Sequence, residues 1–319
     1  MKYSWAVIGY GEIALEMAEV LKKNGRTFYG IFGRSFEKAL SFARRFGISK
    51  VYKNAEELFS DKSVDIVYIA TPNSSHAMYI KDALLHGKNV LCEKPIVLNS
   101  FQLSNAQNTA KKKNLILSEA MTLYHMPLYK NLQKRIQSGE FGSVKMIQVN
   151  FGSFKPYNPE NRFFNPEKGG GALMDIGVYA LSFARWFMTC APEQISSQVT
   201  FAQSGVDEQS GILLSNSKNE IAVISLSFRA KQPKRGTVIC ENAFIEIHDF
   251  PRGNKAEITW TQDGKKEFIE DGNAEDALFY EVLDMEKAIL NSEKEMYLDY
   301  SQDVSDIMTK LCSTWNFSV

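Results

Sequence analysis

The feature that most constrains the fold is a regular alternation, from Tyr3 to Ser118, of short β-branched runs with longer helical patterns. Hairpins would join such runs by short turns, whereas here a segment of helix length separates each run from the next. This alternation is typical of parallel βαβ units. We therefore predict an α/β fold that begins with a doubly wound parallel sheet, whose strands cover 4–8, 27–32, 51–52, 64–70, 89–92 and 115–118.

A glycine pattern, Gly9 to Ala14 (GYGEIA), directly follows the first predicted strand and opens the first predicted helix. Gly9 permits a tight turn, Gly11 lets the backbone approach a pyrophosphate, and Ala14 is small enough for the helix to pack on the strand. An isolated match of this kind can also be an ordinary strand-to-helix turn that binds no dinucleotide. Its place between a strand and a helix predicts a Rossmann dinucleotide site, with phosphates held by the amides at the helix N-terminus.

Arg34 and Ser35 follow the second predicted strand, where NAD-binding proteins place an acid that binds the ribose hydroxyls. An arginine and a serine suit the 2′-phosphate of NADP instead. The alternative for Arg34 is a solvated surface residue at the start of a helix. We predict NADP as the cofactor and leave NAD open.

The second half of the chain has a different pattern, in which short segments alternate apolar and polar residues and turn residues separate them. These segments are expected strands at 144–154, 195–203, 211–215, 221–229, 244–248 and 256–260. Helices are expected at 127–138 and 173–188, and two more close the chain. We predict a Rossmann domain at 1–120 and an α+β domain at 121–319 with an open-faced, mainly antiparallel sheet. A sheet covered on one face only exposes apolar surface, so we expect a homodimer or homotetramer through this sheet.

The composition limits the kinds of molecule that the chain is expected to bind. The 319 residues are 44% hydrophobic, and 37 basic residues balance 37 acidic ones without charged blocks, which argues against nucleic acid or an anionic membrane and favours a small-molecule ligand. The cysteines Cys92, Cys190, Cys240 and Cys312 form no metal or disulfide pattern, so we expect no metal and a reducing cytoplasm. Neither a signal-like segment nor an apolar run long enough to cross a bilayer is found.

Three further motifs point to a family. Thr71 to His76 (TPNSSH), Cys92 to Pro95 (CEKP) and Gly169 to Tyr179 (GGGALMDIGVY) follow one another along the chain. With the glycine loop, they resemble the Gfo/Idh/MocA oxidoreductases over nearly the whole chain. Tyrosine rather than histidine ends the third motif, as in the branch that resembles dimeric dihydrodiol dehydrogenase and NADP-linked D-xylose dehydrogenase. The resemblance implies a C-terminal open-faced sheet that forms dimers or tetramers.

Two positions depart from that branch. The run after Ala120 is Met121 to Pro127 (MTLYHMP), where the branch commonly has an arginine and a histidine-proline pair, so the identity of the substrate is open. Asn73 stands where dihydrodiol-type members often have histidine, which replaces a ring contact near the cofactor by an amide contact. We expect the use of the cofactor to survive this change.

Lys94 and Tyr179 are the residues we assign to catalysis. Hydride transfer needs a group that exchanges the hydroxyl proton, while the cofactor supplies the difficult step. A free tyrosine has a pKa of about 10, so only about one molecule in a thousand is phenolate at neutral pH. A lysine ammonium about 4 Å away contributes up to about 4 kcal/mol, which brings the phenol into working range. Which of the two transfers the proton stays open.

Asp175 lies four residues before Tyr179, so both share one face of a helix. Its carboxylate can bind the substrate hydroxyl or steady Lys94. The alternative is that it does no more than cap the helix. Arg162 and Phe154 are further candidates for substrate contact, with Phe163 and Phe164 beside them. The residues expected to bind the cofactor are Gly9, Gly11, Glu12, Ile13, Arg34, Ser35, Thr71, Pro72, Asn73, His76, Glu93, Lys94 and Glu119.

The expected function is therefore an NADP-dependent dehydrogenase acting on CH-OH or CH-CH groups of a polyhydroxylated small molecule: a sugar, a polyol or a cyclic trans-diol. The alternative is a non-catalytic protein of the same fold that senses a dinucleotide and regulates a partner. The presence of both Lys94 and Tyr179 speaks against that alternative.

Overall fold

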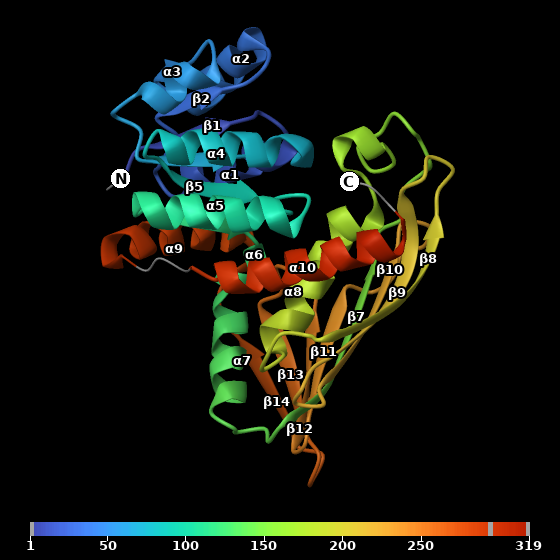
Figure 1. Cartoon of the computed structure of the whole chain (residues 1–319). Coiled ribbons are helices and arrows are strands. Elements are labelled where there is room, and N and C mark those ends of the chain that lie inside the picture. The colour runs from blue at the N-terminus through green and yellow to red at the C-terminus, as the bar shows by residue number, and fades with distance from the viewer. Residues whose placement is uncertain (1–2, 293–295, 317–319) are drawn as a thin grey trace. The chain divides into compact units, whose positions relative to one another are not determined.

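The computed structural model describes residues 3–292 and 296–316 (Figure 1). The chain forms two compact units. The first comprises Met1–Ala120 with Glu275–Asp299, and the second comprises Met121–Ala274 with Tyr300–Val319. The sequence-based division at 120/121 coincides with the first change of unit. It differs for the stretch around 275–299, which the sequence alone assigned to the second domain.

The first unit is built on a six-stranded sheet in which all neighbouring strands are parallel, as the alternation predicted. The strand order is β3-β2-β1-β4-β5-β6, the order of a doubly wound dinucleotide-binding fold. Its topological switch point lies between β1 and β4, so ligands are expected at the carboxyl ends of these strands. The strands are β1 (Trp5–Ile8), β2 (Gly30–Phe32), β3 (Lys50–Val51), β4 (Ile66–Ile69), β5 (Asn89–Glu93) and β6 (Leu117–Ala120).

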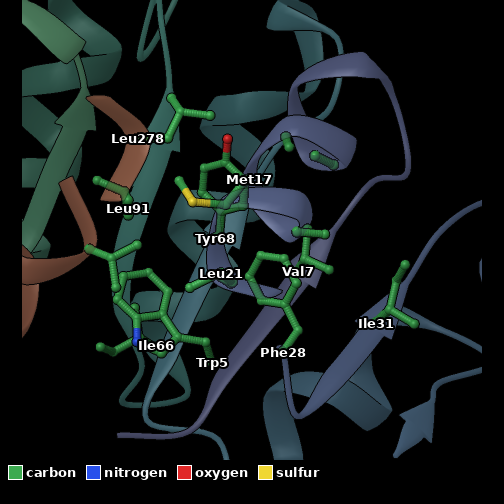
Figure 2. Packing of buried hydrophobic residues seen from close by; sticks show 14 of the residues in the cluster. Trp5, Val7, Met17, Leu21, Phe28, Ile31, Ile66, Tyr68, Leu91 and Leu278 are labelled. Carbon is green, nitrogen blue, oxygen red and sulfur yellow. The ribbon is translucent and has the colours of Figure 1, made fainter. Parts of the chain in front are cut away.

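Both faces of this sheet are covered by helices, and alternate strand residues enter two different cores. In β1, Trp5 and Val7 point into one core, whereas Ala6 and Ile8 point into the other. Figure 2 shows the first of these cores, where Leu21 of α1 packs near Trp5 and Val7. The helices and helical turns of this unit are α1 (Glu12–Lys23), α2 (Phe36–Phe46), α3 (Ala55–Ser60), η1 (Asn73–Ser75), α4 (His76–Leu85), α5 (Ser100–Lys113) and α9 (Ala277–Asn291).

Helix α9 belongs to the first unit because its apolar stripe completes that core. Leu278, Val282 and Met285 are buried in the same cluster as Trp5 (Figure 2 labels Leu278). A partly buried ion pair adds to this contact, since the Arg26 guanidinium lies 3.0 Å from the Glu286 carboxylate. The periodicity of a helix shows that one face is apolar but not which core receives it, so the sequence alone placed α9 with its neighbours in the chain.

The second unit contains an eight-stranded sheet in the order β14-β13-β12-β11-β7-β10-β9-β8. All neighbours pair antiparallel except β7 and β10, which confirms the expected mainly antiparallel sheet. The strands are β7 (Val144–Gly152), β8 (Gln194–Phe201), β9 (Asp207–Ser215), β10 (Ile221–Ser227), β11 (Arg235–Cys240), β12 (Ala243–His248), β13 (Lys255–Trp260) and β14 (Lys266–Glu270).

Helix α8 packs on β7 and β10, so one face of the central strands is buried. Side chains alternate across these strands. Leu214 and Ala222 are fully buried, whereas their neighbours Leu213 and Val223 are 46% and 42% exposed within this chain. The helices and helical turns of the second unit are α6 (Thr122–His125), α7 (Pro127–Gln137), η2 (Pro166–Lys168), η3 (Leu173–Gly177), α8 (Val178–Phe187) and α10 (Leu298–Thr314), with η4 (Ala274–Asp276) at the boundary before α9.

Candidate active site

The glycine loop lies at the switch point of the first sheet. Gly9 has φ +112°, and a Cβ there would lie 2.2 Å from the carbonyl oxygen of Ala70, so only glycine fits between the two strand ends. Gly11 is the N-cap of α1 without a side-chain hydrogen bond, and a Cβ there would meet no atom within 4 Å. Open space in front of the first α1 amides, at Glu12 and Ile13, is the cradle that a pyrophosphate needs. The loop therefore fits a dinucleotide.

The end of β2 presents one arginine. Arg34 is exposed, while the neighbouring Ser35 hydroxyl accepts a hydrogen bond from the Lys38 amide at 3.4 Å and caps α2. The Tyr10 ring holds this turn from the other side, because a Cβ at Gly33 would lie 2.3 Å from it. The Ser35 amide also donates to the Tyr10 hydroxyl at 3.4 Å. Arg34 is thus the cation that this turn offers to a ligand, with Ser35 shaping the turn.

His76 joins two of the motifs. It is fully buried, and its Nδ1 and Nε2 lie 2.9 Å from the carbonyl oxygens of Pro95 and Thr71 respectively. Burial lowers the pKa of His76, and the Lys94 charge adds to that effect. The structure thus gives His76 a bridging position, whereas Thr71, Pro72 and Asn73 remain at least partly exposed. Any contribution of His76 to cofactor binding therefore acts through the loop that it holds.

Two buried carboxylates flank Lys94 in the sheet. The Tyr68 hydroxyl donates to Glu93 Oε1 at 2.5 Å, and the Ile96 amide donates to Glu119 Oε1 at 3.0 Å. Burial and the Glu93 carboxylate hold the pKa of Tyr68 well above its usual value, so its phenol stays a donor. Lys94 itself is partly exposed between buried neighbours. Tyr68 was not predicted from the sequence as a residue of the site, although a tyrosine inside a buried strand indicates a buried hydrogen-bond partner.

The third motif presents two side chains from a buried segment. Between Gly169 and Met188, every residue is buried except Asp175 and Tyr179. The predicted single helix is a π-helical segment, η3, followed directly by α8, and such π segments often mark functional sites. The Tyr179 ring lies 6.2 Å from that of Phe151. Asp175 and Tyr179 are thus the partly exposed side chains of this segment. That they share one face stays a prediction, because η3 departs from the α-helical geometry on which that prediction rests.

Arg162 lies beside Asp175. Its guanidinium is 3.6 Å from the Asp175 carboxylate and 4.2 Å from the centre of the Phe163 ring. Phe154 is 58% exposed, in keeping with a side chain that meets a ligand. Phe164, in contrast, is fully buried against Phe228 and belongs to the core.

Comparison with known proteins identifies the family. Residues 3–121 match the oxidoreductase family with an NAD-binding Rossmann fold, and residues 129–246 match the C-terminal domain of the same family. The chain is 31% identical to trans-1,2-dihydrobenzene-1,2-diol dehydrogenase of Xenopus laevis over 254 residues, which cover 78% of this chain and 76% of that protein. The chain belongs to the Gfo/Idh/MocA oxidoreductase family.

Two further known proteins are similar to this Gfo/Idh/MocA protein, one in sequence and one in fold. An NADP-dependent scyllo-inositol 2-dehydrogenase of Bacillus subtilis is 29% identical over 79% of this chain and 77% of its own length. A 3-ketoreductase from Actinomadura kijaniata, solved with NADP and TDP-benzene, has the same fold, with a TM-score of 0.84 at 21% identity over 96% of this chain and 95% of that one.

Two further features of the described residues concern membranes and metals. No helix in them is long and apolar enough to cross a membrane. Within 3–292 and 296–316 there is also no group of three or more histidine, cysteine, aspartate or glutamate side chains placed to hold a metal ion.

Proposed function

We propose that this oxidoreductase is an NADP-dependent dehydrogenase that moves a hydride between its cofactor and a carbon of a sugar, a polyol or a cyclic trans-diol, acting on CH-OH or CH-CH groups. The observation that carries the proposal is the partly exposed pair Asp175 and Tyr179 in an otherwise buried segment. A carboxylate and a phenol can together bind a substrate hydroxyl and exchange its proton. The names of the relatives from Xenopus laevis and Bacillus subtilis support the substrate class.

The proposed cofactor is NADP, held by the Gly9 and Gly11 loop, with Arg34 on the 2′-phosphate. Arg34 is exposed at the end of β2, and an arginine forms charge-assisted hydrogen bonds to phosphate. The remaining cofactor contacts are proposed for Glu12, Ile13, Ser35, Thr71, Pro72, Asn73, Glu93, Lys94 and Glu119, and His76 is proposed to contribute through the loop that it holds. When bound, the nicotinamide supplies the hydride chemistry.

The proposed roles of the chain's own residues follow from their chemistry. Lys94 and Tyr179 are the residues proposed to exchange the hydroxyl proton. Asp175 accepts a hydrogen bond from a substrate hydroxyl and fixes its orientation. Arg162 and Phe154 contact the rest of the substrate, the arginine because it already lies beside Asp175. The two neighbours of Lys94 are held in place, the Glu93 carboxylate by the Tyr68 hydroxyl and the Pro95 carbonyl oxygen by His76.

The test is a panel of aldoses, inositols and cyclic trans-diols assayed with NADP and with NAD, following the absorbance of the reduced nicotinamide. We expect turnover on at least one class and a kcat/KM at least about tenfold higher with NADP, since one charge-assisted hydrogen bond contributes about 1.5–3 kcal/mol. Tight NADP binding without turnover on any member of the panel would favour the dinucleotide-sensing alternative. Equal use of both cofactors would remove the assigned role of Arg34.

We also propose that the chain forms a homodimer or homotetramer through the face of the second sheet that carries Leu213 and Val223. Both side chains are more than two-fifths exposed in the single chain, at 46% and 42%. The expected result of light scattering is a molar mass of two or four chains, reduced to one by the double change Leu213→Lys and Val223→Lys. A parent protein that is monomeric at micromolar concentration would contradict the proposal.

We propose a reducing cytoplasm as the location of the protein. All four cysteines are free thiols, and Cys92, Cys240 and Cys312 are buried. This pattern is typical of proteins from reducing compartments.

A further inference from the structure

A buried aspartate that the proposed chemistry does not use lies beneath the third motif. Asp207 begins β9 and is completely buried. Its Oδ2 accepts a hydrogen bond of 2.7 Å from the amide of Leu173, the first residue of η3. Its Oδ1 is buried without a hydrogen-bond partner among the described residues. A carboxyl with one unsatisfied oxygen costs stability, so its presence calls for an explanation.

The motif is shaped around this carboxyl. Gly171 has φ +117°, and a Cβ there would lie 2.2 Å from Asp207 Oδ1. The Gly171 carbonyl in turn accepts a hydrogen bond of 3.2 Å from the amide of Asp175. The carboxyl therefore contacts the motif at two neighbouring points, directly before the π-helical segment. One of those points is linked by a backbone hydrogen bond to Asp175 itself.

The position of the first residue of the π-helical segment decides where the side chains that follow it point. The segment has an i→i+5 pattern, which is rare compared with the α-helical one and is frequently found at functional sites. It carries Asp175, and α8 continues from it with Tyr179 in the first turn. A shift at Leu173 therefore changes where both side chains point. A carboxylate near the amino end of a helix also interacts favourably with the helix dipole.

We propose that Asp207 is a positioning residue, whose carboxyl fixes the start of η3 and thereby the orientation of Asp175 and Tyr179. The inference rests on the proposed function for its effect on turnover, but its structural part does not. Burial raises the pKa of Asp207 to about 7. The interaction with Leu173 requires only an acceptor oxygen, which both protonation states provide.

The test compares Asp207→Leu, which has the same branched side-chain shape and no acceptor, with Asp207→Asn, which keeps an acceptor oxygen. Four quantities are measured: hydrogen exchange in peptides covering 171–180, kcat, KM and the NADP dissociation constant. For Asp207→Leu we expect exchange in this segment to rise and kcat to fall, each at least about tenfold, because the buried Leu173 amide is left without an acceptor. The NADP dissociation constant should stay unchanged. Asp207→Asn should recover most of kcat.

Glu220 provides the matched control. Its carboxylate is also buried, at 3% exposure, and accepts hydrogen bonds from the Thr189 amide at 2.8 Å and the Asn216 amide group at 2.7 Å. Those partners lie beyond the end of α8 rather than at the motif. Glu220→Leu should lower thermal stability but leave kcat and exchange in 171–180 unchanged. An equal loss of kcat in both leucine variants would show a general loss of stability and overturn the proposal.

The other outcomes of this experiment also support or overturn the inference. Parent-like exchange and kcat in Asp207→Leu would overturn the inference. If that variant does not fold, exchange in Asp207→Asn decides, because a neutral amide is a weaker acceptor than a carboxylate and should give a rise of a few-fold, about two to five; unchanged exchange would overturn it. If the parent protein turns over no substrate, the proposed function fails, whereas the exchange measurement still judges the role of Asp207.

Discussion

Replacing Lys94 by alanine is expected to lower kcat by about two to four orders of magnitude, which is the usual contribution of a positioned proton-transfer group. Lys94 follows the last residue of β5 and is partly exposed, whereas Glu93 and Pro95 beside it are buried. Because the Glu93 carboxyl and the Pro95 carbonyl are held by Tyr68 and His76, the loss of the side chain should not move the backbone. The measurement is steady-state turnover on the best substrate of the panel, with NADP affinity determined by titration.

The other end of β5 provides a control lysine. The Lys88 ammonium donates to the carbonyl oxygens of Asp61 and Val64 at 2.6 and 2.9 Å, which is a structural role. Lys88→Met should therefore lower the melting temperature and leave kcat within about twofold, as expected for a change away from the reacting groups. A Lys94→Ala variant with parent-like turnover would remove Lys94 from the chemistry.

A phenylalanine at Tyr179 separates the two proton-transfer assignments. If Tyr179 passes the proton, Tyr179→Phe should lose about as much kcat as Lys94→Ala, because members of one catalytic unit are strongly non-additive. The double variant would then be no slower than either single one. If Lys94 alone exchanges the proton, Tyr179→Phe should retain most of kcat.

The elements that could be predicted from the sequence are those whose own residues indicate their burial or backbone conformation. β4 reads as a continuous apolar run, and all four of its residues are buried on a sheet covered on both faces. The glycine loop was predictable for a similar reason, since the positive φ at Gly9 is a requirement that only glycine meets without strain.

Elements that were missed depend on distant partners. β11 contains Gly236, which reads as a turn residue, but the Phe183 ring of α8 occupies the place where its Cβ would lie, at 2.2 Å. β14 is rich in charged residues and leaves Phe268 73% exposed, so its sequence resembles a loop. In neither case does the local pattern contain the contact that makes the segment a strand.

The candidate site shows the same division. The spacing of Asp175 and Tyr179 predicts a shared face from helix geometry alone, and the structure leaves both side chains partly exposed in an otherwise buried segment. Asp207 was not predicted, since it begins a run, Asp207 to Gly211, whose polar residues are typical of the surface. Its burial follows from the pairing of β9 with β8 and β10, which brings it under Leu173. Contacts between distant segments of this kind leave no periodic signal.

Two glycines of the loop allow stability and cofactor binding to be separated, and Gly9→Ala is expected to give the largest loss of stability. The added methyl group would lie 2.2 Å from the Ala70 carbonyl oxygen, in a backbone conformation with φ +112°. The ends of β1, β2 and β4 hold this residue in place, since its amide donates to Phe32 and the Ala70 amide donates to Ile8, both at 2.9 Å. Backbone strain and overpacking each cost about 1–3 kcal/mol, so the free energy of unfolding should fall by about 2–6 kcal/mol.

Gly11→Ala is the counterpart, because the space around Gly11 is empty and its φ of −74° suits any residue. Its free energy of unfolding should change by less than about 0.5 kcal/mol, whereas NADP affinity should fall, since the methyl group occupies the space through which the backbone approaches the phosphates. Chemical denaturation and NADP titration of both variants check the pair. A Gly9→Ala protein as stable as the parent would contradict the strand geometry, and undiminished NADP binding by Gly11→Ala would place the phosphates elsewhere than at the start of α1.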